Sequence, residues 1–136
     1  MLSKKSYYLS FILVCCLFLI HHSGVLSQDT IWTTGSPMSE PRATCASCEI
    51  DGVIYVVGGL TEDNYPWAVG NMEAYDTKTD TWTTKADMPT PRHNMAVCCL
   101  NGKVYAIGGS DHPTQPGDAH HTVEEYNPVA DTWQSK

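Results

Sequence analysis

Imidazole and carboxylate side chains gather in one short stretch of the sequence, residues 110–122. The stretch contains Asp111, His112, Asp118, His120 and His121. Side chains of these types are ligands that transition metals use in proteins. Their spacing is irregular, however, and prolines and a glycine interrupt the stretch, which favours a solvated polar loop. We therefore expect no metal site and no cofactor.

The six cysteines are the second set of residues that could do chemistry. Two lie in the N-terminal apolar segment, and the others are Cys45, Cys48, Cys98 and Cys99. Cys45 and Cys48 have the spacing of half a zinc-ligand pair, but no second such pair follows. On a strand, residues three apart point to opposite faces, which is wrong for shared ligation. The sequence favours small buried thiols or one inter-strand disulfide, and it leaves three pairings open.

The sequence lacks the common catalytic motifs. It contains no G-x-S-x-G elbow, no H-E-x-x-H pair and no glycine-rich phosphate loop that opens a helix. We therefore expect that the chain is not an enzyme.

Residues 1–27 have the pattern of a secretory signal peptide. Two lysines near the start precede an uncharged apolar run, residues 9–20, which is too short to cross about 30 Å of hydrocarbon comfortably. Val25 and Ser27 then stand at −3 and −1 of a cleavage site before Gln28. We expect a secreted, extracellular protein without stable membrane insertion. An uncleaved anchor is the alternative.

The charge of the chain limits its partners. The formal net charge is −7, and loss of the two N-terminal lysines leaves 6 basic against 15 acidic side chains, or −9. A surface this acidic disfavours phosphate backbones and anionic membranes. We expect no nucleic-acid partner.

The sequence repeats itself at an offset of 50 residues. Residues 38–59 read MSEPRATCASCEIDGVIYVVGG, and residues 88–109 read MPTPRHNMAVCCLNGKVYAIGG. After the double glycine the offset becomes 51, so that residues 73–82 match residues 124–133. An insertion confined to the segment after the double glycine marks that segment as a loop.

These landmarks resemble the kelch repeat. The matching features are the Pro-Arg pair, the hairpin glycine, the aromatic-containing run before Gly-Gly, the E-x-Y-(D/N) strand and the D-T-W ending, from Trp32 to Trp133. The resemblance implies an all-β fold of four-stranded antiparallel blades from a β-propeller. The expected organisation is a signal peptide at 1–27, the last strand of a preceding blade with a linker at 28–42, and kelch repeats at 43–83 and 84–136.

The residues themselves predict the same strands. Residues 43–50 and 53–57 form two strands of the first repeat, joined by an Asp-Gly turn, and Asn-Gly does the same in the second repeat. The third strand holds Tyr75 and the fourth holds Trp82. We expect Trp82 to be buried between sheets, and Trp133 at the final strand to matter less for stability.

The long loops are the expected binding surface. Chain direction reverses at every strand, so the loops after the second and the fourth strand open on one side of the molecule, and function concentrates on such loops. The candidate residues are Arg42, Arg92, Tyr65, Trp67, His93 and His112.

Two alternatives stand for each kind of candidate. The two arginines either capture an acidic ligand, as the resemblance to kelch propellers implies, or form a salt bridge or carbonyl contact that fixes a loop. The aromatic side chains either anchor a partner or fold back over a blade edge.

We expect a secreted kelch-repeat module that binds a protein or a glycan. One alternative is an N-terminal fragment of a larger secreted propeller, including galactose oxidase-like enzymes. A ubiquitin ligase adaptor of the BTB-kelch type is disfavoured, because a signal peptide stands where the BTB domain would be. Since propellers close with about 4–8 blades, two repeats predict self-association or a longer gene product.

Overall fold

The computed structural model describes residues 32–64, 67–112 and 119–136. The predicted signal peptide lies outside these ranges. Residues 32–38 carry no strand, so the expected last strand of a preceding blade stays a prediction. No helix in the described ranges is long and apolar enough to span a bilayer.

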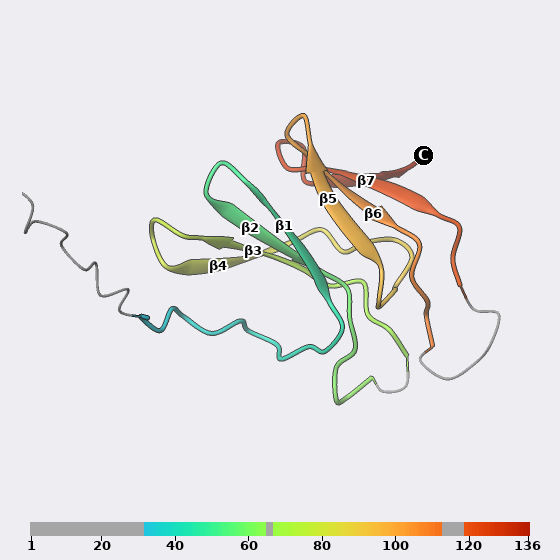
Figure 1. Cartoon of the computed structure of the whole chain (residues 1–136), viewed down its shortest axis with the longest axis horizontal. Coiled ribbons are helices and arrows are strands. Elements are labelled where there is room, and N and C mark those ends of the chain that lie inside the picture. Colours follow the sequence, from blue (N-terminus) through green and yellow to red (C-terminus); the bar gives the residue numbers. More distant parts are fainter. Residues whose placement is uncertain (1–31, 65–66, 113–118) are drawn as a thin grey trace, which may run out of the picture. The chain divides into compact units, whose positions relative to one another are not determined.

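Two four-stranded antiparallel sheets make up the compact unit Gly35–Lys136 (Figure 1). The first sheet consists, in order, of β1 (Ala46–Ile50), β2 (Val53–Val57), β3 (Met72–Asp76) and β4 (Thr81–Lys85). The second sheet consists of β5 (Ala96–Leu100), β6 (Lys103–Ile107), β7 (Val123–Asn127) and β8 (Thr132–Ser135). The predicted all-β fold with four strands per repeat is confirmed.

The first strand of each sheet starts later than the sequence suggests. Ala43 forms only an isolated bridge with Leu60, and the next residue, Thr44, has a φ of 54°. His93 and Asn94 repeat this arrangement in the second sheet, where Asn94 has a φ of 52°. A left-handed residue interrupts the ladder, because the strand conformation requires negative φ.

Both predicted hairpin turns are present. Asp51 and Gly52 have φ values of 53° and 87°, and Asn101 and Gly102 have values of 50° and 70°. Positive φ at both central positions is the condition for the two-residue turn that matches strand twist. These turns therefore fix the register of β1 with β2 and of β5 with β6.

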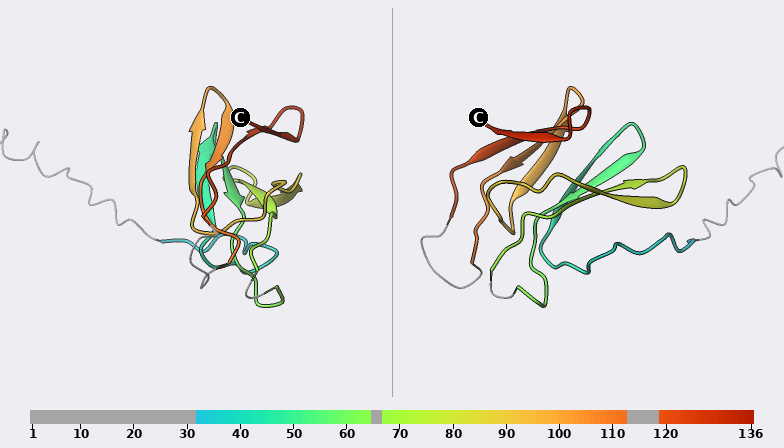
Figure 2. Two further views of the ribbon diagram at one scale, coloured as in Figure 1. Left: turned by 90° about the vertical axis from the view of Figure 1, so that its right-hand side faces the viewer. Right: turned by 180° about the vertical axis from the view of Figure 1, so that it is seen from behind.

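The two sheets pack face to face along their first strands, β1 and β5 (Figures 1 and 2). We call the two surfaces in this contact the covered faces. The covered face of the first sheet carries Ala46, Cys48, Tyr55, Val57, Met72 and Ala74. The covered face of the second sheet carries Val97, Cys99, Val104, Ala106, Tyr126 and Trp133. Together with Met88 and Met95 they form the hydrophobic core.

Side chains alternate along a strand, so each sheet also has an opposite face, which we call the open face. The open face of the first sheet carries Ser47, Glu49, Ile54, Val56, Glu73, Tyr75 and Trp82. The open face of the second sheet carries Ala96, Cys98, Leu100, Tyr105, Ile107 and Glu125. No other strand of the described residues packs on either open face.

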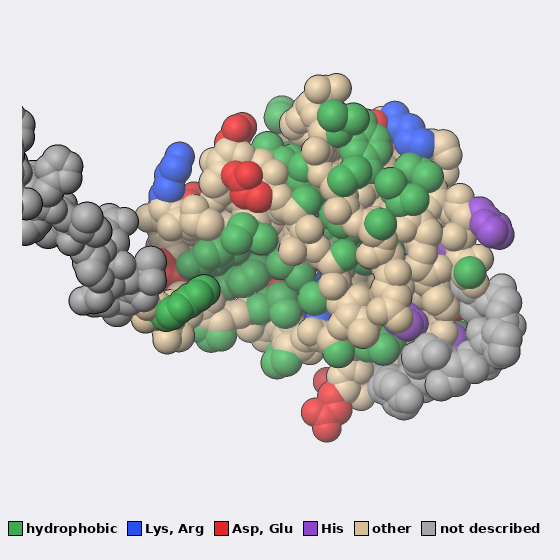
Figure 3. Space-filling model, viewed as in Figure 1, with side chains coloured by type: hydrophobic (Ala, Val, Ile, Leu, Met, Phe, Trp, Pro, Cys, Tyr) green, Lys and Arg blue, Asp and Glu red, His purple; other side chains and the backbone are tan. Residues whose placement is uncertain are grey.

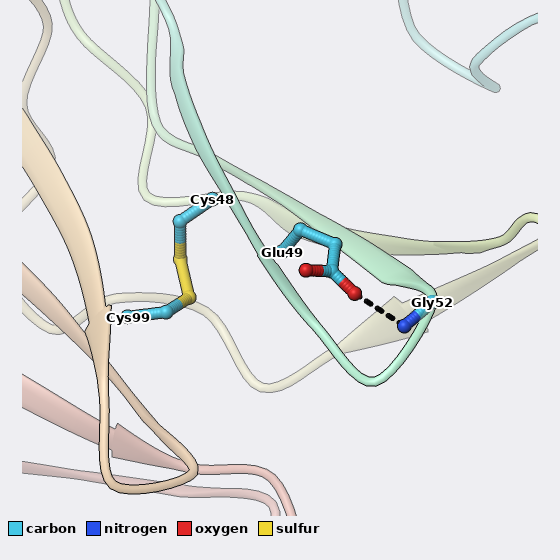
Figure 4. The surroundings of a disulfide bond; sticks show 4 residues. All are labelled: Cys48, Glu49, Gly52 and Cys99. Carbon is cyan, nitrogen blue, oxygen red and sulfur yellow. Dashed lines mark hydrogen bonds between the residues drawn. A yellow bond between two sulfur atoms is a disulfide. The ribbon is translucent and has the colours of Figure 1, made fainter.

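One disulfide joins the covered faces. Cys48 of β1 and Cys99 of β5 are bonded, with 5.8 Å between their Cα atoms (Figure 4). Cys45 and Cys98 are free. By the internal repeat Cys48 corresponds to Cys98, so the bond joins two positions that are not equivalent. The two sheets use opposite faces in their contact: the first sheet contributes the face of Cys48, and the second sheet contributes the face opposite to that of the equivalent Cys98.

The expected burial of Trp82 between two sheets is wrong for the described residues, while the stability ranking of the two tryptophans stays a prediction. Trp133 packs against the core between the sheets, whereas Trp82 lies on the open face of the first sheet. The tryptophan of each sheet faces the sheet that precedes it in the chain, and the described residues contain no sheet before the first. Trp133 therefore occupies the position that the sequence suggested for Trp82.

The double glycines allow close contact between backbones. Gly59 has a φ of 110°, and a Cβ there would lie 2.7 Å from the Ala43 carbonyl oxygen; at Gly109 the same distance, to the His93 oxygen, is also 2.7 Å. No side chain fits at such a distance without backbone movement. Each glycine pair thus lets the segment before the first strand of its sheet pack closely against the end of the second strand.

Candidate functional site on the long-loop face

The long loops meet at one end of the sheets, toward the lower part of Figure 1, where the connection from β4 arrives just before β5 after it has crossed the middle of the view. They connect β2 with β3, β4 with β5, and β6 with β7. A backbone hydrogen bond from Ala68 to the Asp111 carbonyl oxygen, at 2.9 Å, ties a loop of the first sheet to a loop of the second. The loops of both sheets thus contribute to one surface.

The buried guanidinium groups of Arg42 and Arg92 bind backbone carbonyl oxygens of these loops. The Arg92 guanidinium donates to Glu124 at 2.7 Å and to the carbonyl oxygens of Gly108 and Thr122 at 2.7 and 3.0 Å. Its side chain is 0% exposed. These contacts match the loop-fixing alternative for the arginines.

Arg42 repeats the arrangement in the first repeat. It donates to Glu73 at 2.9 Å and to the Asn71 carbonyl oxygen at 2.7 Å, and its side chain is also 0% exposed. A hydroxyl of the preceding segment, from Ser39 or Thr90, donates to the same carboxylate in each repeat. Both buried ion pairs therefore carry further hydrogen bonds, as buried charges require.

A second repeated cluster fixes the segment that leads into each sheet. Tyr126 donates to Asp131 at 2.5 Å, the Ala86 amide donates to the same carboxylate at 2.9 Å, and Trp133 Nε1 donates to the Ala86 oxygen at 2.8 Å. The amide hydrogen bond is the main cause that lowers the pKa of Asp131. Burial is the main cause that raises the pKa of Tyr126. The tyrosine thus stays a donor and the aspartate an acceptor.

The first repeat has the same cluster on its open face. Tyr75 donates to Asp80 at 2.6 Å, the Ser36 amide donates to Asp80 at 2.7 Å, and Trp82 Nε1 donates to the Ser36 oxygen at 2.8 Å. The amide of Ser36 is the main cause that lowers the pKa of Asp80. Residues 35–42 therefore lie along the first sheet as residues 85–92 lie along the second.

A pocket of about 210 Å³ opens where the loops of the two sheets meet. The described residues that line it are Trp67, Ala68, Thr90, Pro91, Asp111 and His120. Asp111 Oδ1 and His120 Nε2 are buried and have no hydrogen-bond partner among the described residues. A carboxylate oxygen without a partner in a pocket is an acceptor for an incoming donor.

The sequence candidates are distributed unevenly around this pocket. Trp67 lines it and is 56% exposed, and its ring meets His112 edge-on, with 5.0 Å between centroids. His112 itself is buried. His93 is buried and does not line the pocket. Tyr65 lies outside the described residues.

Sequence reasoning singled out Asp111 and His120 only as metal ligands. Across the described residues, no group of three or more His, Cys, Asp and Glu side chains is arranged to hold a metal ion, and Asp118 lies outside those residues. The sequence did place Asp111 and His120 in a loop of the predicted binding surface, but it did not indicate that they line a pocket. No pattern in the sequence indicated that the pocket is also lined by Ala68, Thr90 and Pro91.

The comparisons with known proteins assign the family. The Kelch motif model matches residues 41–89 and 91–135, more than half of the chain. The chain therefore belongs to the kelch motif family, and its two sheets are β-propeller-type blades.

Individual proteins support the fold. Kelch-like protein 30 of Homo sapiens is 39% identical over 54 residues, which are 40% of this chain and 8% of that protein. A solved structure of YjhT superimposes with a TM-score of 0.57 at 21% identity and covers 76% of this chain and 29% of that one.

A copper complex of a fungal alcohol oxidase of the AA5 family superimposes with a TM-score of 0.60 at 14% identity, over 70% of this chain and 22% of that one. At these identities the two solved structures show the fold alone. The chain spans less than a third of each of the three proteins.

Proposed function

We propose that this chain is a secreted, non-catalytic binding module that takes a cationic side chain of a protein partner into the pocket between its loops. The observation that carries the proposal is Asp111 Oδ1, buried at the pocket without a hydrogen-bond partner among the described residues. Lysine and arginine supply several donors to such an oxygen.

The surroundings of Asp111 favour the same ligand. Trp67 offers an exposed indole ring, on which a cation is attracted by the ring quadrupole. Tryptophan is also a frequent anchor of protein interfaces. The excess of acidic side chains in the chain attracts a basic partner over longer distances.

NMR titration with single amino-acid amides tests the proposal. N-acetyl-arginine methylamide should shift the amide signals of Ala68 and Asp111, and N-acetyl-glutamine methylamide should not. Asp111→Asn should weaken the binding about tenfold, in line with loss of one charge-assisted hydrogen bond. Asp63→Asn removes the same charge from an exposed position of a neighbouring loop and serves as the control.

Two results would overturn the cationic ligand. One is equal binding by Asp111→Asn and the unchanged chain. The other is a response to a neutral oligosaccharide such as lactose in place of the arginine amide, which would favour the glycan alternative.

Secretion rests on two separate supports. Residues 1–27 have the sequence pattern of a signal peptide. The Cys48–Cys99 disulfide is typical of an oxidising compartment. Expression in a secretory cell line should release a protein that begins at or near Gln28. Recovery of the intact N-terminus in the membrane fraction would mean an anchor instead.

A further inference from the structure

The open face of the second blade repeats the covered face of the first. Equivalent positions carry Ala96 for Ala46, Cys98 for Cys48, Leu100 for Ile50, Tyr105 for Tyr55, and Ile107 for Val57. Leu100 is 59% exposed and Ile107 is 42% exposed, and Cys98 is exposed beside them. Hydrophobic side chains over the second sheet are visible in Figure 3. An apolar strip of this kind marks an interaction site.

The backbone at the edge of this strip is open as well. A Cβ at Gly58 in the first blade would collide with the Arg92 oxygen and with Met95, both from the second repeat. Among the described residues, the only atom within 4 Å of a Cβ at the equivalent Gly108 is the His120 oxygen, at 3.6 Å. In the first blade this side is filled by the second repeat, and in the second blade the described residues leave it open.

The open face of the first blade repeats the covered face of the second in the same way. Ile54 stands for Val104, Val56 for Ala106, Tyr75 for Tyr126, and Trp82 for Trp133. The segment that runs along it is bound by the same tryptophan hydrogen bond, 2.8 Å in both repeats. Each chain therefore presents both halves of its own inter-blade contact.

Near the hairpin turns, each open face carries a charged residue where the equivalent covered face has an uncharged one, and the two charges have opposite signs. Lys103 stands where the first blade has Val53, and Glu49 stands where the second blade has Cys99. Figure 4 shows Glu49 directed away from the Cys48–Cys99 bond, on the other side of β1. When the open face of a second blade meets the open face of a first blade, Lys103 and Glu49 come to the same end of the contact.

We propose that two copies of this chain associate head to tail, with the open face of the second blade of one copy against the open face of the first blade of the next. The contact continues the geometry that joins the two blades within the chain. It covers Leu100 and Ile107 and pairs Lys103 with Glu49 of the neighbouring copy.

Glu125 is a further charge on this face besides Lys103, and it stands where the first blade has Ala74. It accepts hydrogen bonds from Tyr105 at 2.8 Å and from Gln134 at 2.6 Å, and Lys136 lies 2.9 Å from it. Its charge is thus compensated within its own sheet, which reduces the cost of covering it.

Such a contact is heterologous, so it builds rings or open filaments rather than a two-fold dimer. Because propellers close with about 4–8 blades, a ring would contain about two to four copies.

Charge reversal tests the contact in sedimentation velocity runs on the mature chain. Lys103→Glu places two carboxylates opposite each other and should raise the dissociation constant at least about tenfold. The double variant with Glu49→Lys as well should return it to within about threefold of the unchanged chain. Lys78→Glu, at an exposed turn, is the control for the change of net charge.

Cross-linking tests the register independently. In a Cys45→Ser background, Glu49→Cys should give a Cys98 disulfide between copies when oxidised glutathione is added. The two thiols lose two protons and two electrons, and the glutathione disulfide takes them up to become two thiols. A ladder should form on a non-reducing gel, and Cys98→Ser should remove it. Thr79→Cys places a thiol on an exposed turn as the matched control.

Three outcomes would overturn the proposal. The unchanged chain could remain monomeric at every concentration tested. The variant with Glu49→Cys could cross-link no faster than the control with Thr79→Cys. Peptide mapping could find Cys98 joined to Cys98, which would indicate a two-fold contact.

Discussion

At the residue scale, the most informative finding is that both candidate arginines are structural. Arg42 and Arg92 each bind a buried glutamate and at least one carbonyl oxygen of a loop. Their roles differ from that of Asp111, whose carboxylate oxygen has no partner among the described residues. The buried arginines fix the loops, whereas the pocket residues are the ones that we propose to contact a ligand.

Loss of Arg92 should therefore destabilise the fold. Arg92→Ala leaves Glu124 buried and unpaired, and breaking a buried pair in this way costs about 3–5 kcal/mol. Urea denaturation followed by fluorescence measures the loss. The double variant Arg92→Met with Glu124→Gln should recover most of it, because no lone charge remains. An Arg92→Ala variant as stable as the exposed control Lys78→Ala would contradict the structure.

Glu125 should make the stability of the fold depend on pH in the acid range. Its hydrogen bond with Lys136 is the main cause that lowers its pKa to about 2, and those with Tyr105 and Gln134 act in the same direction. A lowered pKa in the folded state gives stability that is present above the unfolded value, about 4.3, and is lost as the pH falls toward 2.

Urea midpoints measured between pH 2 and pH 6 check this contribution. The unchanged chain should lose more stability across that interval than Glu125→Gln, which has no proton to bind there. Parallel curves for the two proteins would refute the assignment.

At the element scale, hairpins and strands followed from the sequence, and the stacking of the sheets did not. Asp-Gly and Asn-Gly fixed the turns, and the repeat fixed the strand order. Which face of each sheet is covered depends on how one sheet is rotated relative to the next. The repeat pattern in the sequence does not determine that rotation. The partner of Cys48 and the position of Trp82 were therefore beyond the pattern.

The two tryptophans give a direct test of that stacking. Trp133→Ala removes a side chain packed on the core and should cost about 3 kcal/mol, near the lower end for a buried aromatic. Trp82→Ala acts on the open face of the first blade and should cost less. Thermal melts of the two variants at a concentration that favours the monomer decide the order. A larger loss for Trp82→Ala would mean that the stacking is reversed.

The disulfide should be a major source of stability. It closes a loop with a sequence separation of 51 residues, for which chain entropy predicts roughly 4 kcal/mol. The double variant Cys48→Ser with Cys99→Ser should lose a large part of this in urea denaturation. Cys45→Ser removes a free thiol and should change little. Equal stability of both variants would contradict the assigned pairing.

At the scale of the whole molecule, the described residues form two propeller-type blades, and no further sheet of these residues packs on either open face. The sequence predicted the loops that carry the pocket, because long connections gather at one end of such sheets. It did not predict the pocket itself, since Trp67 and Ala68 of the first repeat meet Asp111 of the second only through the packing of the two repeats. Self-association remains a prediction, which sedimentation velocity on the mature chain decides.

The single disulfide also determines what happens when a protease cuts the loop between β2 and β3. Glu62, Asp63 and Asn64 are exposed there, and the cut lies between the two bonded cysteines. The halves of a nicked chain should stay covalently joined and keep the sheets together. Limited digestion should therefore produce two bands on a gel only after reduction. The protein can thus lose continuity of its backbone without separating into two pieces.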